Sequence, residues 1–445
     1  MTKLTRRTLL KSSVAFSGAV TLNHLAPQST NKSMPKSMMD VPFEKRDTVH
    51  LGIIGTGSRG SEMLKEWLAV PNVKVTALCD IDKAQLAKAA ERVQKAGQPA
   101  PATFSNGERD FENLCKRDDV DFIYIATPWD WHAPMAVAAM TNGKHCGIEV
   151  PAIVTLKEAW DIVNTSERTR RHCLIMENCC YGLSEMLVLN LTKAGVLGEL
   201  LHSEAAYNHD LRFIINENRS EGLWRRAPHM TRNGNLYPTH GLGPVSNYMS
   251  INRGDRYEHI VSMSSPALGL DEYRAKTEPK DSPKWKEKYI CGDLNTSLIK
   301  TAKGRTIMLQ HNITTPRPYD RINLIQGTKG VFRDYPERIY VEGQAGGERF
   351  TNLSSYKAQY EPGLWKTVGE LARQNGGHGG MDYVMVYRIV ECMRQGIAPD
   401  IDVYDAAAWS VTTPLSEQSV AQGSAPVKFP DFTRGGWQTK RSVMG

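Results

Sequence analysis

The segment IIGTGSRGSEM, residues 53–63, constrains the fold more than any other part of the sequence. Gly55, Gly57 and Gly60 stand in the GxGxxG spacing, between an apolar, strand-like segment and one with helical periodicity. The first glycine permits a tight turn, the second lets a pyrophosphate approach the backbone, and the third lets the helix pack on the strand. This pattern predicts a dinucleotide-binding turn.

The residues around this turn alternate between strand-like and helical patterns. Apolar, β-rich segments are expected to be strands, and segments with 3.6-residue periodicity are expected to be helices. Such alternation predicts a doubly wound parallel sheet with helices on both faces, a Rossmann domain over residues 46–177. The expected strands are 49–55, 73–80, 120–127, 144–150 and 172–177, the expected helices are 58–70, 82–97, 132–143 and 156–170, and PAPATF (99–104) is expected to be a loop.

Three strand ends of this domain carry candidate functional residues. Asp80 ends the second strand, where a carboxylate accepts hydrogen bonds from an adenosine ribose and repels a 2′-phosphate, so NAD is expected rather than NADP. Trp129, Trp131 and His132 follow a later strand, and Glu149 ends another. Ligands of doubly wound sheets bind at this edge. The alternative for the tryptophans is that they only cap the sheet.

The second half of the chain has a different pattern. After Glu177 the strand-like segments are separated by long loops, which favours an α+β domain over residues 178–432 with a largely antiparallel, open-faced sheet. That open face is expected to cover the cofactor or to pack in a homo-oligomer. Two late helices are expected, at 381–396 and 403–423.

Charge and cysteine content exclude several classes of partner. Six of the 55 Lys and Arg residues precede the first acidic residue, Asp40, so the rest of the chain is nearly neutral. This argues against nucleic acid and anionic membranes as partners. The eight cysteines lack paired spacing, and no CxxC or HxxxH pattern occurs, so no metal site is expected.

The segment TRRTLLK, residues 5–11, precedes a short apolar stretch and has the pattern of a twin-arginine export leader. The stretch is too short to span a bilayer as a helix. Residues 1–36 are therefore interpreted as leader and linker, and the protein is expected to be exported already folded to the periplasm.

Longer motifs carry a resemblance to a known family. GTGSRG, ATPWDWH and EVP resemble the glucose-fructose oxidoreductase and inositol dehydrogenase superfamily. ENCCY, AAYNHDLR, YPTHGLGP and GGHGGMDY resemble one branch of it, the NAD-dependent α-N-acetylgalactosaminidases, which are glycoside hydrolases. The dehydrogenases carry a lysine where this chain has Val150, and that branch shares the valine.

The resemblance implies two sets of site residues. It implies cofactor contacts at Ser58, Arg59, Asp80, Trp129, Asp130, Trp131, His132, Glu149, Val150 and Asn178. It implies sugar contacts at Tyr207, Arg225, Tyr237, Pro238, Thr239, His240 and Tyr319.

The implied chemistry is an oxidation that is later reversed. Oxidation at C3 of a terminal α-linked N-acetylgalactosamine acidifies C2, the group at C1 is eliminated, water adds, and C3 is reduced again. His240 is expected to handle the C3 hydroxyl proton. Tyr181 and Tyr319 are candidates for the C2 proton or the leaving group, although a tyrosine base needs a lowered pKa. Glu149 is expected to orient nicotinamide or sugar.

Two other functions fit some of the same features. A periplasmic NAD-dependent sugar oxidoreductase would use the same leader and fold, but Val150 argues against it. A sugar-binding or sensor protein would bind NAD and sugar without turnover.

Overall fold

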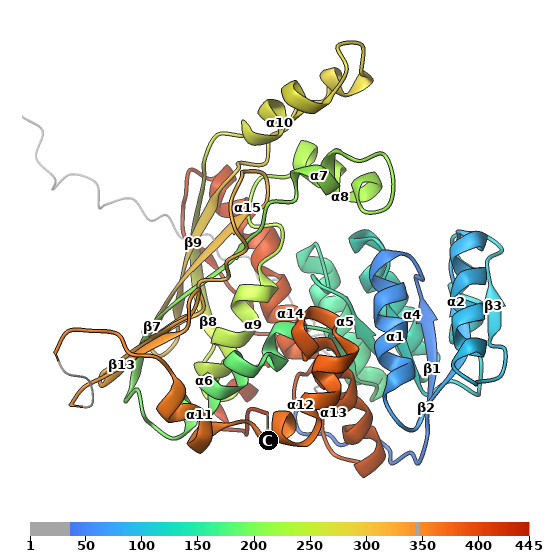
Figure 1. Cartoon of the computed structure of the whole chain (residues 1–445), viewed down its shortest axis with the longest axis horizontal. Helices are drawn as coiled ribbons and strands as arrows, with labels where there is room; N and C mark the ends of the chain where they lie inside the picture. Colours follow the sequence, from blue (N-terminus) through green and yellow to red (C-terminus); the bar gives the residue numbers. More distant parts are fainter. Residues whose placement is uncertain (1–35, 344–346, 445) are drawn as a thin grey trace, which may run out of the picture. The chain divides into compact units, whose positions relative to one another are not determined.

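The computed structural model describes residues 36–343 and 347–444 (Figure 1). The predicted leader, residues 1–36, lies outside the described residues except for Lys36. Within the described residues no helix combines the length and the apolar character that a membrane span requires.

The first sheet is parallel and has the strand order β3-β2-β1-β4-β5-β6. The order reverses between β1 and β4, and this switch point is where a doubly wound sheet binds its ligand. Its strands are β1 (Val49–Ile54), β2 (Val73–Cys79), β3 (Ala102–Phe104), β4 (Phe122–Ile125), β5 (His145–Ile148) and β6 (Cys173–Ile175). Its helices are α1 (Ser58–Ala69), α2 (Lys83–Lys95), α3 (Phe111–Cys115), α4 (Trp129–Thr141) and α5 (Leu156–Thr169).

Local sequence explains the helix starts in this domain. The Asp82 side chain accepts hydrogen bonds from two backbone N–H groups at the start of α2, and Thr155 and Glu158 form a capping box at α5. The expected loop 99–104 was wrong in its second half, because Ala102–Phe104 pair with β2 as an edge strand. Prolines are tolerated next to an edge strand, because the strand pairs on one side only and the other side needs no backbone N–H donors.

The second sheet has eight strands in the order β13-β12-β11-β7-β10-β9-β8-β14. All its pairings are antiparallel except that of β7 with β10. The largely antiparallel sheet expected from the sequence is therefore confirmed. Its strands are β7 (Leu200–Asn208), β8 (Tyr257–Ser264), β9 (Asn295–Thr301), β10 (Thr306–Asn312), β11 (Leu324–Gly327), β12 (Gly330–Arg333), β13 (Arg338–Val341) and β14 (Val427–Lys428).

Helices cover one face of this sheet. Burial alternates along β9, and α9 and α15 pack on the buried side, whereas Met263 and Leu298 on the other side are exposed. The α-helices of this half are α6 (Leu183–Lys193), α7 (Arg212–Asn216), α8 (Gly222–Thr231), α9 (Thr239–Tyr248), α10 (Gly269–Thr277), α11 (Ser354–Tyr360), α12 (Gly363–Asn375), α13 (Met381–Gln395), α14 (Val403–Ser410) and α15 (Thr412–Ala421). The short 3₁₀ helices are η1 (Asn178–Tyr181), η2 (Pro283–Lys286), η3 (Gly377–Gly380) and η4 (Gly436–Gln438).

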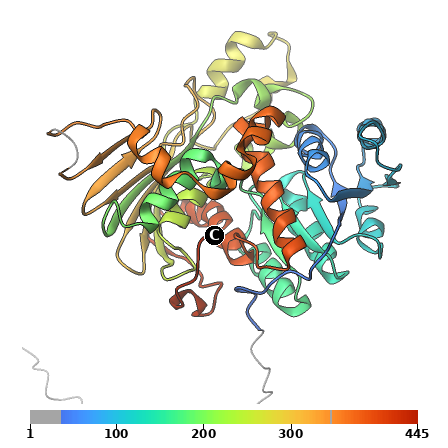
Figure 2. The same ribbon diagram turned by 60° about the horizontal axis from the view of Figure 1, so that its bottom comes forward.

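The last helices return to the first sheet. α13 packs against α1, and α14 packs against α5 and β6. In the turned view, orange-red helices from the end of the chain lie beside the blue and teal elements of the first domain (Figure 2). The single helix expected at 403–423 is instead α14 followed by α15. Pro414 explains the break, because it lacks the N–H that a continuous helix needs. Helices from the end of the chain thus complete the first domain.

Candidate active site

The glycine-rich turn has the geometry that a dinucleotide requires. Gly55 has φ +89°, and a Cβ added at Gly60 would lie 1.9 Å from the Gly55 carbonyl oxygen, so only glycine allows α1 to approach β1 this closely. A Cβ added at Gly57 would meet no atom within 4 Å. The start of α1 has no side-chain cap, so its N–H groups can serve a phosphate. These features fit NAD.

Asp80 follows β2 at the carboxyl edge of the sheet. Its Oδ2 accepts hydrogen bonds from the Thr56 backbone N–H at 2.7 Å and from the Thr56 hydroxyl at 3.0 Å. Its Oδ1 accepts from the Asp82 N–H at 2.8 Å. The carboxylate is therefore fixed beside the glycine-rich turn, as expected for a residue that binds a ribose.

Arg59, in the same turn, contacts a distant segment of the chain. Its Nε donates to Glu149 Oε1 at 2.9 Å, and its two terminal nitrogens donate to the two oxygens of Asp382 at 2.9 Å each. Asn178 Nδ2 also donates to Asp382, at 2.8 Å. Arg59 holds the pKa of Asp382 well below its usual range, although burial acts in the opposite direction. Two predicted cofactor residues, Arg59 and Asn178, thus contact Asp382, and a third, Glu149, is joined to it through Arg59.

Glu149 and Val150 follow β5. Glu149 also accepts a hydrogen bond of 2.8 Å from the Tyr124 hydroxyl, so its carboxylate is held from two sides. Val150 is buried. Val150 places no ammonium group at this position.

The four residues Trp129 to His132 form the first turn of α4 and point in different directions. Trp129 is buried and its ring reaches Trp224 and Tyr237, with centroids 5.1 Å and 5.9 Å away. Asp130 is exposed, and Trp131 packs against Phe111. His132 is buried between two backbone carbonyl oxygens, and burial lowers its pKa. Of these four residues, only Trp129 has a side chain that contacts the predicted sugar residues.

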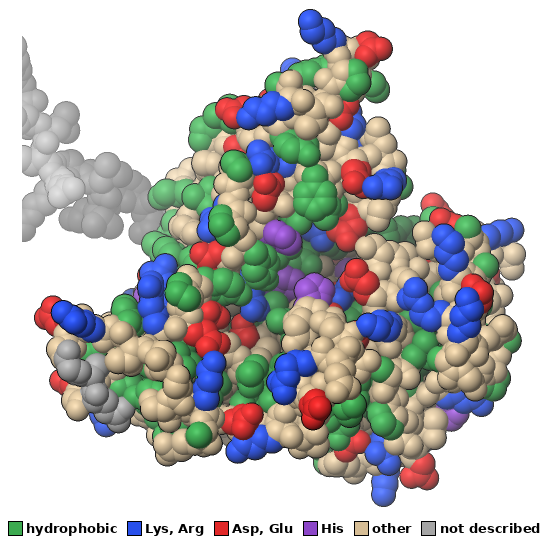
Figure 3. Space-filling view, viewed as in Figure 1, with side chains coloured by type: hydrophobic (Ala, Val, Ile, Leu, Met, Phe, Trp, Pro, Cys, Tyr) green, Lys and Arg blue, Asp and Glu red, His purple; other side chains and the backbone are tan. Residues whose placement is uncertain are grey.

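Most of the predicted sugar residues form one aromatic group that continues from Trp129. The ring centroids of Tyr207 lie 4.6 Å from Tyr237, 5.2 Å from His240 and 6.2 Å from Tyr319. The close approach of α9 to β7 requires Gly241, because a Cβ there would lie 2.6 Å from the Ala206 nitrogen. Figure 3 shows histidine side chains gathered in a hollow on this side of the molecule.

Arg225, on α8, packs on this aromatic group. Its guanidinium lies 5.1–5.3 Å from the ring centroids of Trp129, Trp224 and Tyr237. Its Nε donates to Glu221 at 2.7 Å, and among the described residues its buried Nη1 has no hydrogen-bond partner. Pro238 and Thr239, at the start of α9, are buried beneath the group.

His240 is fixed by a buried carboxylate. Its Nδ1 lies 2.7 Å from Glu177 Oε1, and the Glu177 side chain is fully buried. Tyr319 is 40% exposed at the rim of the group. Burial raises the pKa of Tyr319 and raises that of Tyr207 to about 12, so both hydroxyls carry their proton at neutral pH.

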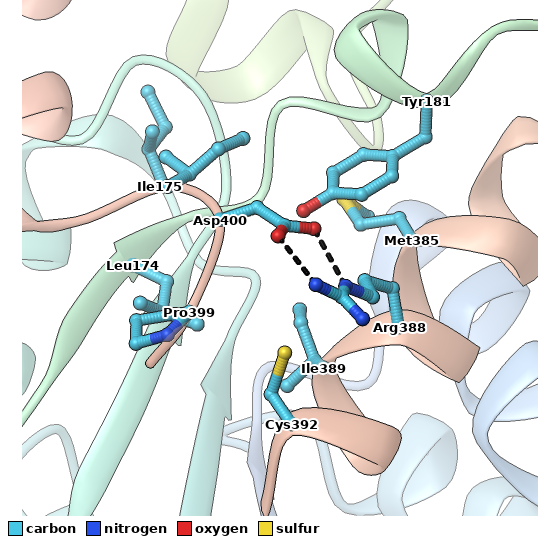
Figure 4. Close-up of a pocket in the computed structure, with 10 residues that line it drawn as sticks. Leu174, Ile175, Tyr181, Met385, Arg388, Ile389, Cys392, Pro399 and Asp400 are labelled. Carbon is cyan, nitrogen blue, oxygen red and sulfur yellow. Dashed lines mark hydrogen bonds and ion pairs between the residues drawn. The ribbon is translucent and has the colours of Figure 1, made fainter. Parts of the chain in front are cut away.

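Tyr181 does not reach this group. Its side chain lies in a small pocket lined by α13 residues and by Asp400, and Figure 4 shows the hydroxyl beside the ion pair of Arg388 with Asp400. Burial raises the pKa of Tyr181 well above its usual value. The structure thus separates Tyr181 from the other candidate catalytic residues.

Several residues of the site were missed by the sequence reasoning. Glu177 follows β6 at the carboxyl edge, the same signal that selected Glu149. His378 and Asp382 stand in the GGHGGMDY motif. His209 Nδ1 lies 3.1 Å from the Tyr207 hydroxyl, within AAYNHDLR. Trp224 precedes Arg225 in the segment LWRR, which also resembles the family, but only Arg225 was selected from it.

One group of side chains could hold a metal ion. Among the described residues, Glu177, Cys179 and His240 have ligand atoms within 4.8 Å of one another. The 2.7 Å contact between His240 and Glu177 is that of a direct hydrogen bond, so a metal ion between them would have to replace it. Burial raises the pKa of the Cys179 thiol, which disfavours the thiolate that binds metals.

Family models match both halves of the chain, and curated proteins match it over its full length. Residues 181–439 match the model described as glycosyl hydrolase 109, C-terminal domain, and residues 49–177 match the oxidoreductase family, NAD-binding Rossmann fold. A glycosyl hydrolase family 109 protein of Solibacter usitatus is 55% identical over 446 residues, covering 100% of both chains. One from Saccharopolyspora erythraea is 51% identical over 98% of this chain and 95% of its own.

Solved structures share the fold. Levoglucosan dehydrogenase in complex with NADH and levoglucosan has a TM-score of 0.68 and 18% identity, over 86% of this chain and 100% of that chain. The apo scyllo-inositol dehydrogenase from Lactobacillus casei has a TM-score of 0.61 and 12% identity, over 86% of this chain and 99% of that chain. The Rossmann fold with a second, mostly antiparallel domain is therefore confirmed.

Proposed function

The chain belongs to the glycosyl hydrolase 109 family and binds NAD, and we propose that it releases terminal α-linked N-acetylgalactosamine from glycans by oxidation, elimination, addition and reduction. The substrate is a glycan or a small glycoside. We also propose that the folded, NAD-loaded protein is exported to the periplasm, which the twin arginine of TRRTLLK supports.

One observation carries the proposal. The aromatic group of Trp129, Tyr237 and Tyr207 is continuous from the first turn of α4, at the switch point of the NAD-binding sheet, to His240. Flat aromatic faces suit the apolar side of a sugar ring, and the nearby histidine and arginine supply groups for its hydroxyls. A sugar bound on this group would therefore lie beside the nicotinamide end of the dinucleotide site.

The residues of the glycine-rich turn, together with Asp80, would hold NAD. When bound, NAD supplies a reversible hydride acceptor for C3 of the sugar. His240, whose Nδ1 is occupied by Glu177, offers Nε2 to the C3 hydroxyl and takes its proton. Arg225 donates hydrogen bonds to sugar oxygens through Nη1.

Tyr207 and Tyr319 serve better as proton donors than as bases. Burial keeps the hydroxyls of Tyr207 and Tyr319 protonated at neutral pH. Tyr319, which is at the rim, is suited to protonate the leaving group as the bond at C1 breaks. His209 is close to both tyrosines and can exchange protons with the Tyr207 hydroxyl.

A chromogenic assay tests the proposal. Purified protein is incubated with an aryl α-N-acetylgalactosaminide, its β-anomer and the aryl α-galactoside, while absorbance of NADH is followed. Release from the α-N-acetylgalactosaminide without net NADH is expected, with the two anomers within about tenfold of each other, or 1.4 kcal/mol. Accumulation of NADH with an oxidised sugar would instead identify an oxidoreductase, and binding without release would identify a sugar-binding protein.

A further inference from the structure

Glu177 is a buried carboxylate next to the candidate catalytic histidine. It follows β6, precedes η1, and has a fully buried side chain. Its Oε1 lies 2.7 Å from His240 Nδ1 and accepts a second hydrogen bond, of 3.1 Å, from the Cys179 backbone N–H. Among the described residues, its buried Oε2 has no hydrogen-bond partner.

Such a carboxylate is costly to bury. An ionised carboxylate away from water needs compensating charge or hydrogen bonds. Burial alone raises the pKa of Glu177, but the charge and hydrogen bond of His240 outweigh it and hold the pKa below its usual value. His240 therefore stabilises this carboxylate most, and the Thr239 side chain and the Cys179 N–H add to its effect.

Glu177 and His240 lie on segments that pack directly against each other. α9, which carries His240, packs against η1. A Cβ at Gly243 of α9 would lie 2.9 Å from Glu177 Cγ, so the helix and the glutamate are already in close contact. The pair is thus rigidly fixed, which is what a positioning role requires.

We propose that Glu177 is the positioning residue of His240: it accepts a hydrogen bond from the Nδ1–H, keeps Nε2 free to face the sugar, and stabilises the imidazolium that forms. This proposal rests on the proposed function. In the step that it supports, the proton of the C3 hydroxyl moves to Nε2 as C3 is oxidised, and bound NAD would supply the hydride acceptor. The Nδ1 proton stays in place and Glu177 remains ionised.

The kinetics of three variants test whether Glu177 acts through His240. Glu177→Gln should lower kcat by about 10²–10⁴-fold, as loss of a carboxylate that orients a catalytic histidine does elsewhere, with KM changed less than about threefold. His240→Ala should be at least as slow. The double variant should equal His240→Ala within about twofold, because Glu177 acts only through His240. A double variant slower than His240→Ala by the full factor of Glu177→Gln would overturn the proposal.

A second measurement does not depend on turnover. In protein labelled with ¹⁵N-histidine, nitrogen chemical shifts report which ring nitrogen of His240 carries the proton, and His240→Ala assigns the signal. Protonated Nδ1 is expected in the native protein, and a mixture of tautomers in Glu177→Gln. Protonated Nε2 with bare Nδ1 in the native protein would overturn the proposal. This result is independent of whether the protein is a glycosidase.

Glu167→Gln is the matched control for loss of a buried carboxylate. Glu167 is also buried, and it accepts hydrogen bonds from Arg434 and from the Tyr404 hydroxyl, away from His240. The control is expected to lower thermal stability while kcat changes less than about threefold. If Glu177→Gln fails to fold, Glu177→Asp, with its shorter side chain, takes its place in both measurements, and an unchanged kcat in that variant would contradict the proposal.

Discussion

Arg59 and Asp382 are 323 positions apart in sequence and joined by two hydrogen bonds of 2.9 Å each. Arg59 belongs to the glycine-rich turn after β1, and Asp382 to the first turn of α13. The pair therefore fixes a C-terminal helix directly to the glycine-rich turn of the NAD-binding domain. A cofactor that must remain bound through turnover benefits from such an enclosure.

Asp382→Asn should weaken NAD retention. Removing one partner of a buried ion pair costs up to about 3–5 kcal/mol of stability, and Arg59 keeps Glu149 as a partner, so a smaller loss is expected here. We expect lower thermal stability and at least about a tenfold rise in the Kd for NAD, equivalent to 1.4 kcal/mol. The measurement is the NAD content of protein purified without added cofactor, followed by a binding titration of the stripped protein.

Asp400→Asn is the control for this prediction. Asp400 accepts two hydrogen bonds of 2.8 Å from Arg388, so it forms a similar pair away from the glycine-rich turn. Its loss should lower stability and leave the Kd for NAD within about threefold. Equal effects of the two variants on NAD binding would show that the Arg59 pair has no special role.

His378 should contribute stability that depends on pH. Its Nδ1 lies 2.7 Å from Asp382, and that hydrogen bond raises its pKa above the ordinary 6.5. A raised folded-state pKa means that the stabilisation is fully present below the unfolded pKa and is lost as pH rises through the folded one. His378→Asn is the variant to compare, because asparagine tolerates the backbone φ of +46° at this position. The difference in unfolding free energy between the native protein and this variant should be largest below pH 6.5 and should shrink above it. Denaturant titrations over this pH range measure the difference. A difference that does not change with pH would contradict the prediction.

The two candidate catalytic tyrosines should respond differently to loss of the hydroxyl. Tyr319→Phe should lower kcat by about 10²-fold or more, because Tyr319 belongs to the aromatic group of predicted sugar residues. Tyr181→Phe should change kcat less than about threefold, because its hydroxyl lies in the pocket of Arg388 and Asp400. NAD content should be unchanged in both. The reverse order of effects would show that Tyr181, and not Tyr319, serves the reaction.

Arg225→Lys should weaken sugar binding. Lysine cannot keep both the hydrogen bond to Glu221 and a donor in the position of Nη1, and it loses the planar contact with Trp129 and Tyr237. A charge-assisted hydrogen bond contributes about 1.5–3 kcal/mol, so kcat/KM should fall by about 10–100-fold. Arg226→Lys is the control, since Arg226 pairs with Glu287 and should leave kcat/KM within about twofold. Equal losses in the two variants would count against a sugar contact at Arg225.

Sequence patterns predicted those features that depend on only a few neighbouring residues, such as turns and strand ends. The spacing of Gly55, Gly57 and Gly60 predicted the tight turn after the first strand, because the backbone geometry at Gly55 and the close approach at Gly60 admit only glycine. Asp80 and Glu149 were found because strand ends of a parallel sheet share one edge. The break between α14 and α15 was also readable, from Pro414, but helical periodicity on both sides obscured it.

Pairings across the chain could not be read in the same way. Glu177 and His240 are 63 positions apart, and only the packing of α9 on η1 brings them together. Tyr181 follows Glu177 closely in ENCCY, but the 3₁₀ turn directs its side chain to α13 and away from His240. The motif marked the right segment, and the direction of each side chain in it depends on the tertiary structure.

Isotope exchange at C2 of the released sugar tests the oxidation and elimination mechanism most directly. The protein hydrolyses its substrate in heavy water over many turnovers, and the released N-acetylgalactosamine is analysed by NMR and mass spectrometry, with free sugar incubated alongside as the control. Removal of the C2 proton by a group that exchanges with solvent predicts deuterium at C2 of the product. A displacement at C1 never breaks that C–H bond, so released sugar with a fully protonated C2 would contradict the account.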